Sequence, residues 1–378
     1  MKIAYIAHVV FPDVAGDPFN SLKSAKWMSR RGHETAIVTW NKRKSSSNLV
    51  ENIDGVEIWR LAGVNFKLNN YITEYPFALG MANALRHIEP DIIHAESHLF
   101  LTTVQAIRNA KKLGLPIVVT VHGVFADRGF AVNFAQYVYL LTFGVKIFRK
   151  ADRIICLTRS DAEEIVKFGC SIDKIRVIPN AVDTESFKPC EEREDNLVVW
   201  VGRFVPEKGL EYLVEAAKIV ADEFRDVTFL LVGYGPLKAK ILKLIYDRGS
   251  LGRFVRFAGP LGRDEVAKVL GKAAVFVFPS LKEGLPLSVL EAMACGVPVI
   301  GSDIPGISDV VTHGKNGLLV SPRNPKALAN AVLILLNDKN LTRRLGQNAR
   351  RLMAEKYSWN VITDKIEKVY YEAIQKEK

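Results

Sequence analysis

Two glutamates in the last third of the chain are spaced so that they can act together. Glu283 follows an apolar stretch that breaks at Pro279, and Glu291 lies eight residues further on, in a segment that Gly296 ends. The pattern predicts a strand, a short loop and a helix that begins near Pro286. Eight residues are about two helical turns, so both carboxylates can lie on one side of this element. Such a pair could bind the hydroxyl groups of a polar ligand.

The start of that helix is a second feature with chemical potential. Proline suits the first helical position because its missing N–H costs nothing there. Free backbone N–H groups at the positive end of a helix bind anions such as phosphate. For the two glutamates, the alternative is that Glu283 is only a solvated loop residue and Glu291 only a polar position on an amphipathic helix. The predicted anion site comprises Gly284, Leu285, Pro286 and Leu287.

Two cations follow a strand earlier in the same half of the chain. Arg203 and Lys208 lie in a loop between an apolar strand that ends at Val201 and a helix that opens at Leu210. In a parallel sheet such a loop lies at the carboxyl edge, where ligands bind. The planar fork of Arg203 and the point charge of Lys208 could together hold a diphosphate. A pair of ordinary surface charges is the alternative.

Both stretches resemble motifs of the retaining glycosyltransferases of the group 1 family, which is glycosyltransferase family 4 with the GT-B fold. Glu283 and Glu291 match its Glu-x7-Glu signature, and Gly202, Arg203 and Lys208 match its Gly-Arg-x4-Lys motif. The resemblance implies transfer of a sugar from a nucleotide diphosphate sugar to a hydroxyl group with retention of configuration. Arg203 and Lys208 would bind the diphosphate and stabilise the leaving nucleotide. Glu291 would hold the ribose hydroxyls, and Glu283 would lie nearer the sugar.

The same resemblance assigns roles to residues outside these two motifs. Gly16 takes the place of the second glycine in a loop that closes over the donor phosphates and the acceptor, although Ala15 replaces the first glycine. His122 ends an apolar strand and matches a histidine that contacts the transferred sugar, and Phe257 belongs to a segment beside the nucleotide base. A structural histidine and a plain buried strand are the alternatives for these two. Glu96 stands where the family often has a second histidine.

Short apolar strands alternate with helical segments through both halves of the chain. This alternation predicts an α/β fold of two Rossmann-like domains, each with a doubly wound parallel sheet covered on both faces, as in the GT-B fold. A charged run at 184–195 lacks apolar periodicity and is the expected linker. Residues 1–186 would form an acceptor-side domain with a crossover helix at 358–378, which resembles the family's last helix. Residues 187–357 would form the nucleotide-sugar domain, with substrates in the interdomain cleft.

Composition limits the partners and the location that we expect. The 378 residues are 48% hydrophobic and 25% charged, as in ordinary globular proteins. The four cysteines form no CxxC pair, which argues against a disulfide framework or a zinc site. No apolar window reaches the roughly 18 residues of a membrane span, so we expect a cytoplasmic protein. The net charge of +11 is shared between residues 1–186 (+5) and the remainder (+6) without a recognition motif, which argues against a nucleic-acid partner.

One helix is a candidate for contact with a membrane. The segment 131–149 is apolar nearly all round and ends in a basic cluster, and residues 101–150 contain seven Lys and Arg opposed only by Asp127. An interfacial helix on anionic lipid has this pattern, so we expect a glycan or lipid-linked acceptor and a peripheral location at the inner membrane surface. The alternative is a buried crossover helix with a cationic end.

We expect no cofactor and no metal ion. The chain has no Asp-x-Asp triplet of the kind that commonly holds a metal-bound diphosphate, and Arg203, Lys208 and the helix start offer positive charge instead. A dinucleotide-dependent dehydrogenase is an alternative because Gly233 and Gly235 follow a strand, but Lys238 stands where the fingerprint needs a third glycine. A sugar-nucleotide epimerase, a sugar phosphorylase and a non-catalytic sugar-nucleotide sensor also remain open.

Overall fold

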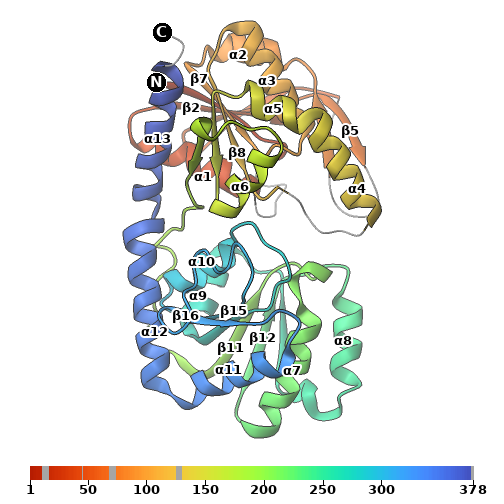
Figure 1. Ribbon diagram of the computed structural model, residues 1–378, viewed down its shortest axis with the longest axis vertical. Coiled ribbons are helices and arrows are strands. Elements are labelled where there is room, and N and C mark those ends of the chain that lie inside the picture. Colours follow the sequence, from red (N-terminus) through yellow and green to blue (C-terminus); the bar gives the residue numbers. More distant parts are fainter. Residues whose placement is uncertain (11–16, 45, 68–73, 125–129, 376–378) are drawn as a thin grey trace. The chain divides into compact units, whose positions relative to one another are not determined.

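The chain folds into two compact α/β units, each of which appears in Figure 1 as a β-sheet with helices around it. The first unit holds the described residues of 1–179 together with 362–375, and the second unit holds 180–361. The computed structural model describes residues 1–10, 17–44, 46–67, 74–124 and 130–375.

The first unit is built on an eight-stranded sheet with the strand order β10-β9-β8-β7-β1-β2-β4-β3. Neighbouring strands are parallel except for the antiparallel pair β3 and β4. The strand order reverses at β1, which pairs with β2 on one side and with β7 on the other. Ligand sites of open α/β sheets lie beyond the carboxyl ends of the strands at such a switch point. The strands of the sheet are β1 (Lys2–Ile6), β2 (Glu34–Trp40), β3 (Leu49–Ile53), β4 (Val56–Leu61), β7 (Ile92–Glu96), β8 (Ile117–Val121), β9 (Arg153–Cys156) and β10 (Ile175–Val177), and a separate antiparallel pair consists of β5 (Gly63–Lys67) and β6 (Glu74–Ala78).

Apolar side chains on both faces of this sheet require helices on both sides of it. The strands β7 and β8 are buried along their whole length, as expected for parallel strands between two helix layers. Their residues Ile93 and Val119 belong to one continuous hydrophobic core. The helices of this unit are α1 (Asp17–Arg30), α2 (Met81–Ile88), α3 (Leu101–Leu113), α4 (Phe130–Tyr139), the π-helical η1 (Leu140–Gly144), α5 (Val145–Lys150), α6 (Arg159–Lys167), the 3-10 turn η2 (Ile172–Lys174) and most of α13 (Trp359–Gln375).

The second unit contains a six-stranded parallel sheet with the order β13-β12-β11-β14-β15-β16. Its order reverses between β11 and β14, so the loops that follow these two strands meet at the switch point. Trp200 of β11 and Phe276 of β14 are fully buried in its core. The elements are β11 (Glu194–Val201), η3 (Pro206–Lys208), α7 (Leu210–Glu223), β12 (Thr228–Val232), α8 (Lys238–Tyr246), η4 (Gly249–Arg253), β13 (Val255–Gly259), α9 (Arg263–Lys272), β14 (Ala273–Phe278), α10 (Leu287–Ala294), β15 (Val299–Ser302), β16 (Gly317–Val320), α11 (Pro325–Asn337), α12 (Lys339–Leu352) and η5 (Met353–Tyr357).

The segment expected to be a linker is partly folded into the second unit. Phe187 is buried, and the guanidinium group of Arg350 donates hydrogen bonds of 2.8 Å to the carbonyl oxygens of Thr184 and Phe187. The second unit therefore begins at Asn180, earlier than the predicted start at 187. At the other end, the chain returns to the first unit from Ile362 onward, a few residues after the predicted 358.

The two doubly wound sheets confirm the predicted α/β fold class. Among the described residues, no helix combines the length and the apolar character that crossing a membrane requires.

Candidate functional site

Two loops of the second unit meet at the switch point of its sheet. The loop after β11 carries Arg203 and Lys208, and the loop after the neighbouring strand β14 carries Glu283. The ammonium group of Lys208 lies 2.6 Å from Oε1 of Glu283, and both side chains are largely buried. The hydroxyl group of Ser280 lies 2.5 Å from the same carboxylate oxygen. Residues 75 positions apart in the sequence thus form one charged cluster.

Glycines allow these loops to approach one another so closely. Gly209 follows Lys208 with a positive φ of 64°, and a Cβ atom there would lie 2.0 Å from the carbonyl oxygen of Pro279. Gly306, in the loop after β15, has a φ of +84°, and its Cβ atom would lie 1.9 Å from the carbonyl oxygen of Gly284. No side chain fits at such distances, so glycine is required at both positions.

The helix start beside Glu283 differs in detail from the prediction. α10 begins at Leu287, and Pro286 is its N-cap with a ψ of 120° rather than its first helical residue. The amide nitrogen of Asn180 donates a hydrogen bond of 2.9 Å to the carbonyl oxygen of Leu285, which holds the loop before the helix. The N–H groups of Leu287 and Ser288 have no acceptor among the residues that the structure describes. This end of α10 therefore offers two donors to an anion.

Glu291 lies about one turn into α10 and has its own cation. Its side chain is buried, and its Oε1 lies 2.6 Å from a guanidinium nitrogen of Arg263. Arg263 is the first residue of α9, where the helix dipole disfavours positive charge. The ion pair with Glu291 offsets that disadvantage. Arg263 is not among the site residues predicted from the sequence. Gly262 and Arg263 nevertheless repeat, at a second strand-to-helix loop, the Gly-Arg pair formed by Gly202 and Arg203.

Arg203 lies at the carboxyl edge of this sheet, and Phe257 lies on its outer strand β13. The Arg203 side chain is exposed and forms no hydrogen bond or ion pair within the described part of the chain. Phe257, on β13, is half-buried, and its ring centroid lies 6.0 Å from that of Phe204, which directly follows Arg203. The aromatic contact joins β13 to the loop after β11.

In the first unit, a histidine and a glutamate pair at the carboxyl ends of β7 and β8. Glu96 is the last residue of β7, and His122 directly follows β8. Nε2 of His122 lies 2.6 Å from Oε2 of Glu96, with each side chain only 7% exposed. Burial tends to raise the pKa of Glu96, but the hydrogen bond to His122 and the neighbouring histidines bring this pKa below its ordinary value. The carboxylate is therefore ionised and fixes the orientation of the His122 ring.

His94, on the same strand as Glu96, is held inside the core. Its Nδ1 lies 2.5 Å from the hydroxyl of Tyr370, and its Nε2 lies 2.7 Å from the hydroxyl of Thr120. Burial lowers the pKa of His94, so the ring is neutral. The Tyr370 hydroxyl in turn donates to that of Tyr5. These contacts tie α13 to β1, β7 and β8, which is a structural arrangement.

Two further sequence predictions concern the loop glycine Gly16 and the binding of a metal ion. Gly16 lies outside the described residues. Within the ranges that the structure describes, no three His, Cys, Asp or Glu side chains are grouped so that they could hold a metal ion.

The arrangement in the second unit is suited to a ligand that carries both phosphate and hydroxyl groups. Lys208, Arg203 and the start of α10 provide positive charge and N–H donors for an anion at the switch point. Glu283 and Glu291 provide acceptors for hydroxyl groups on either side of that helix start. His122 and Glu96 form a separate polar pair in the first unit.

Comparisons with known proteins match both halves of the chain. A family model described as "Glycosyl transferases group 1" matches residues 182–352, and one described as "Glycosyltransferase Family 4" matches residues 23–186. A relative from Mycolicibacterium hassiacum named "MMP alpha-(1->4)-mannosyltransferase" is 30% identical over 313 residues, which are 79% of this chain and 75% of the relative.

Solved structures share the fold over nearly the whole length. Sucrose-phosphate synthase from Thermosynechococcus elongatus superposes with a TM-score of 0.80 at 23% identity and covers 99% of both chains. The HepE protein of Anabaena in complex with UDP-glucose superposes with a TM-score of 0.78 at 19% identity and covers 98% of this chain and 99% of its own.

Proposed function

The chain belongs to the group 1 glycosyltransferases of glycosyltransferase family 4, and from this premise we propose that it transfers a sugar from a nucleoside diphosphate sugar to an acceptor hydroxyl group. The transfer proceeds with retention of the anomeric configuration and needs no divalent metal ion. The observation that carries the proposal is the cluster of Lys208, Glu283 and the start of α10 at the switch point, with Arg203 beside it. UDP-glucose in the similar HepE structure supports a nucleotide sugar as donor.

The leaving group is the part of the donor that needs most stabilisation. When the bond between the anomeric carbon and the diphosphate breaks, its electron pair goes to the phosphate oxygen, and negative charge grows there. Arg203, Lys208 and the N–H groups of Leu287 and Ser288 are fixed donors for that charge, so they stabilise the transition state more than the ground state. The acceptor hydroxyl attacks from the same face and gives its proton to the departing phosphate oxygen.

The carboxylates recognise the two sugar rings of the donor. Glu291 binds the ribose hydroxyls, and Arg263 holds its carboxylate in place through the 2.6 Å ion pair. Glu283 lies nearer the transferred sugar and accepts hydrogen bonds from its hydroxyls. Phe257 lies beside the nucleotide base. This division assigns donor binding to the second unit.

The first unit contributes to the acceptor and to the transferred sugar. His122 contacts the sugar, and Glu96 is a positioning residue that orients its ring through the 2.6 Å hydrogen bond. The acceptor is a glycan or a lipid-linked molecule presented at the cytoplasmic surface of an anionic membrane. The exposed aromatic side chains of α4, of which Phe134 is 62% exposed and Tyr137 47%, support the membrane-presented acceptor.

Donor screening followed by product analysis tests this function. Thermal-shift measurements with UDP-, GDP- and ADP-sugars identify the donor, and proton NMR of the transfer product then reports its anomeric configuration. A product of inverted configuration contradicts the retaining mechanism. An isomerised sugar formed without acceptor indicates an epimerase, a requirement for inorganic phosphate indicates a phosphorylase, and tight binding without turnover indicates a sensor.

A further inference from the structure

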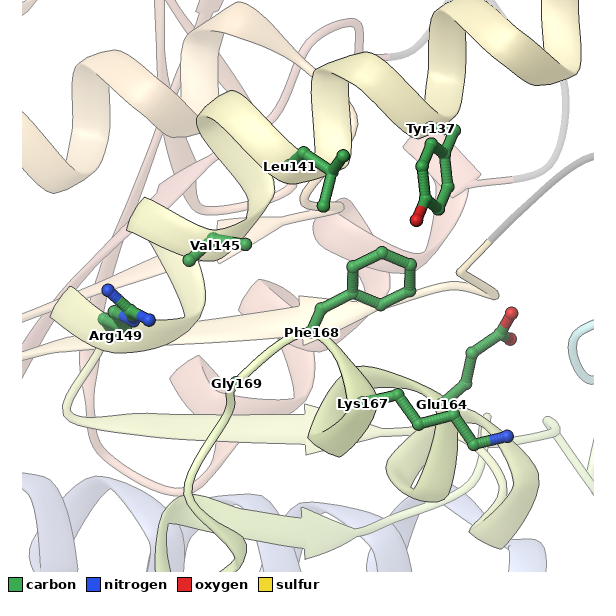
Figure 2. Close-up of a pocket in the computed structure, with 8 residues that line it drawn as sticks. All are labelled: Tyr137, Leu141, Val145, Arg149, Glu164, Lys167, Phe168 and Gly169. Carbon is green, nitrogen blue, oxygen red and sulfur yellow. The ribbon is translucent and has the colours of Figure 1, made fainter.

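A pocket of about 540 Å³ opens in the first unit between the helix α4-η1-α5 and the end of α6. Figure 2 shows the ring of Phe168 in its centre, with Leu141 and Tyr137 above it, Arg149 to one side and Lys167 to the other. The rings of Tyr137 and Phe168 lie edge to face, with their centroids 6.0 Å apart. The pocket therefore combines an apolar wall with a cationic rim.

The apolar wall continues outside the pocket as an exposed stripe. Leu141 is 51% exposed, and Val138 and Phe134, one and two turns before it, are 43% and 62% exposed. The opposite face of the same helix, with Gln136 and Leu140, is buried. The helix is thus not covered all round, and one of its faces presents large apolar side chains to the solvent.

The π-helical turn η1 keeps the pocket-lining side chains of this helix in one row. Tyr137, Leu141 and Val145 are spaced by four residues, and in an ideal α-helix this spacing drifts by about 40° per step, because each turn has 3.6 residues. The wider turn between Leu140 and Gly144 counters the drift, so all three side chains line the same pocket. Single π turns of this kind occur frequently at functional sites.

The cations at the rim have no partners of their own within the described residues. Neither the guanidinium group of Arg149 nor the ammonium group of Lys167 forms a hydrogen bond or an ion pair there. Lys174 adds a third positive charge, because its ammonium group donates to the carbonyl oxygens of Arg149 and Ala151 at 2.7 and 2.9 Å. Among the described residues that line the pocket, Glu164 is the one acidic residue.

The end of the pocket that carries Arg149 lies at the opposite edge of the sheet from the His122 and Glu96 pair. α5 ends just before β9 begins, and α6 starts after the carboxyl end of β9 and runs back toward its amino end. Arg149, Phe168 and Gly169 are therefore at the amino edge, whereas Glu96 ends β7 at the carboxyl edge. A phosphate group held by Arg149 therefore does not occupy the position of a substrate at the carboxyl edge.

We propose that this pocket binds the head group of an anionic phospholipid and docks the first unit on a bilayer. Arg149 and Lys167 contact phosphate oxygens, while Tyr137, Leu141 and Val145 contact the glycerol backbone and the first acyl carbons. The charge of the rim is complementary to an anionic head group, and the exposed stripe fits the boundary between head groups and acyl chains. The inference deepens the proposed membrane contact but does not depend on the proposed transfer reaction.

Sedimentation of the full-length protein with vesicles tests the pocket. Wild-type protein should bind vesicles of phosphatidylglycerol and phosphatidylcholine at low salt, and should not bind phosphatidylcholine alone. Each neutralised cation should lower the partition coefficient about five-fold. The double variant Arg149→Gln, Lys167→Gln should thus bind about 25-fold more weakly, while its turnover with a water-soluble acceptor is unchanged. Leu141→Ser should also weaken binding without any change in charge.

A matched control separates the pocket from general electrostatic attraction. Arg225 and Lys243 are exposed cations of the second unit, so Arg225→Gln, Lys243→Gln removes the same charge elsewhere. An equal loss of vesicle binding in this control overturns the proposal, as does failure of the wild-type protein to bind anionic vesicles. Stabilisation by soluble glycerol phosphate that Arg149→Gln abolishes, without vesicle binding, would instead assign the pocket to a free phosphate ester. Failure of the transferase function would leave all of these vesicle results unaltered.

Discussion

Replacement of Arg203 is the sharpest test of how the leaving group is stabilised. The side chain is exposed and forms no hydrogen bond or ion pair with the described residues. Arg203→Ala should therefore change the free energy of unfolding by no more than about 0.5 kcal/mol, as at other exposed sites. A change in activity can then be attributed to the lost contact with the ligand rather than to damage of the fold.

Arg203→Ala should destabilise the transition state more than the complex with bound nucleotide. Loss of one donor that faces developing charge costs about 2.7–4 kcal/mol, so kcat should fall about 100- to 1000-fold. Free nucleoside diphosphate keeps Lys208 and the two N–H groups at the start of α10, and its affinity should therefore fall by no more than about ten-fold. Arg203→Lys restores the charge without the planar fork and should recover only part of kcat.

Steady-state kinetics and calorimetric binding of the free nucleotide measure the two effects separately. Arg225 is an exposed arginine that precedes β12 at the amino edge of the same sheet, so Arg225→Ala is a matched control that should leave both quantities unchanged. Full turnover in Arg203→Ala would refute the reasoning. An equal fall of kcat/KM and nucleotide affinity, with kcat unchanged, would mean that Arg203 stabilises the bound donor and the transition state equally.

Further predictions concern the other charged groups. Glu291→Ala should weaken nucleotide binding by about 1.5–3 kcal/mol, or roughly 10- to 150-fold, and unchanged calorimetric affinity would contradict its assignment to the ribose. Turnover should persist in EDTA, and activity that is lost there and restored by Mg²⁺ or Mn²⁺ would disprove metal independence. Glu96→Gln should lower kcat and alter its pH profile because His122 loses its anionic partner, whereas a purely structural role would change only the melting temperature. Burial lowers the pKa of His98 from 6.5 to about 4, so the unfolded state binds more protons, and about 3 kcal/mol of stability should be lost as the pH falls from 6.5 to 4. Urea unfolding of His98→Gln should show a weaker pH dependence over this range.

Local patterns explain why the doubly wound fold and the two site loops could be predicted from the sequence. A strand that breaks at Pro279 and a strand that ends at Val201 are visible as apolar runs, and parallel sheets place polar loops after such runs at the carboxyl edge. The doubly wound topology then brings these two loops together. The pairing of β11 with β14, which joins Lys208 to Glu283, is supplied by the structure.

The detailed partners could not be predicted because they depend on distances across the fold. The ion pair of Arg263 and Glu291 joins two helices, and the sequence around either residue does not indicate which residue it pairs with. The helix at 131–149 shows the same limit, because apolar residues on all sides do not reveal which face is buried. The start of α10 was misplaced by one residue because Pro286 suits both the N-cap and the first helical position.

The ion pairs of the second unit bear on how donor recognition proceeds. Lys208 is neutralised by Glu283, and Arg263 is neutralised by Glu291, so the unliganded site has little net charge apart from Arg203. A diphosphate brings about two negative charges, which Arg203 and the partial charge of α10 offset only in part. Under the proposed function, Lys208 must therefore turn from Glu283 toward the diphosphate. The carboxylate that it leaves then needs new donors in a buried place, and the hydroxyl groups of the transferred sugar are the donors at hand. Phosphate binding and sugar recognition are coupled in this way, because the ammonium group of Lys208 cannot form a close ion pair with Glu283 and with the diphosphate at the same time.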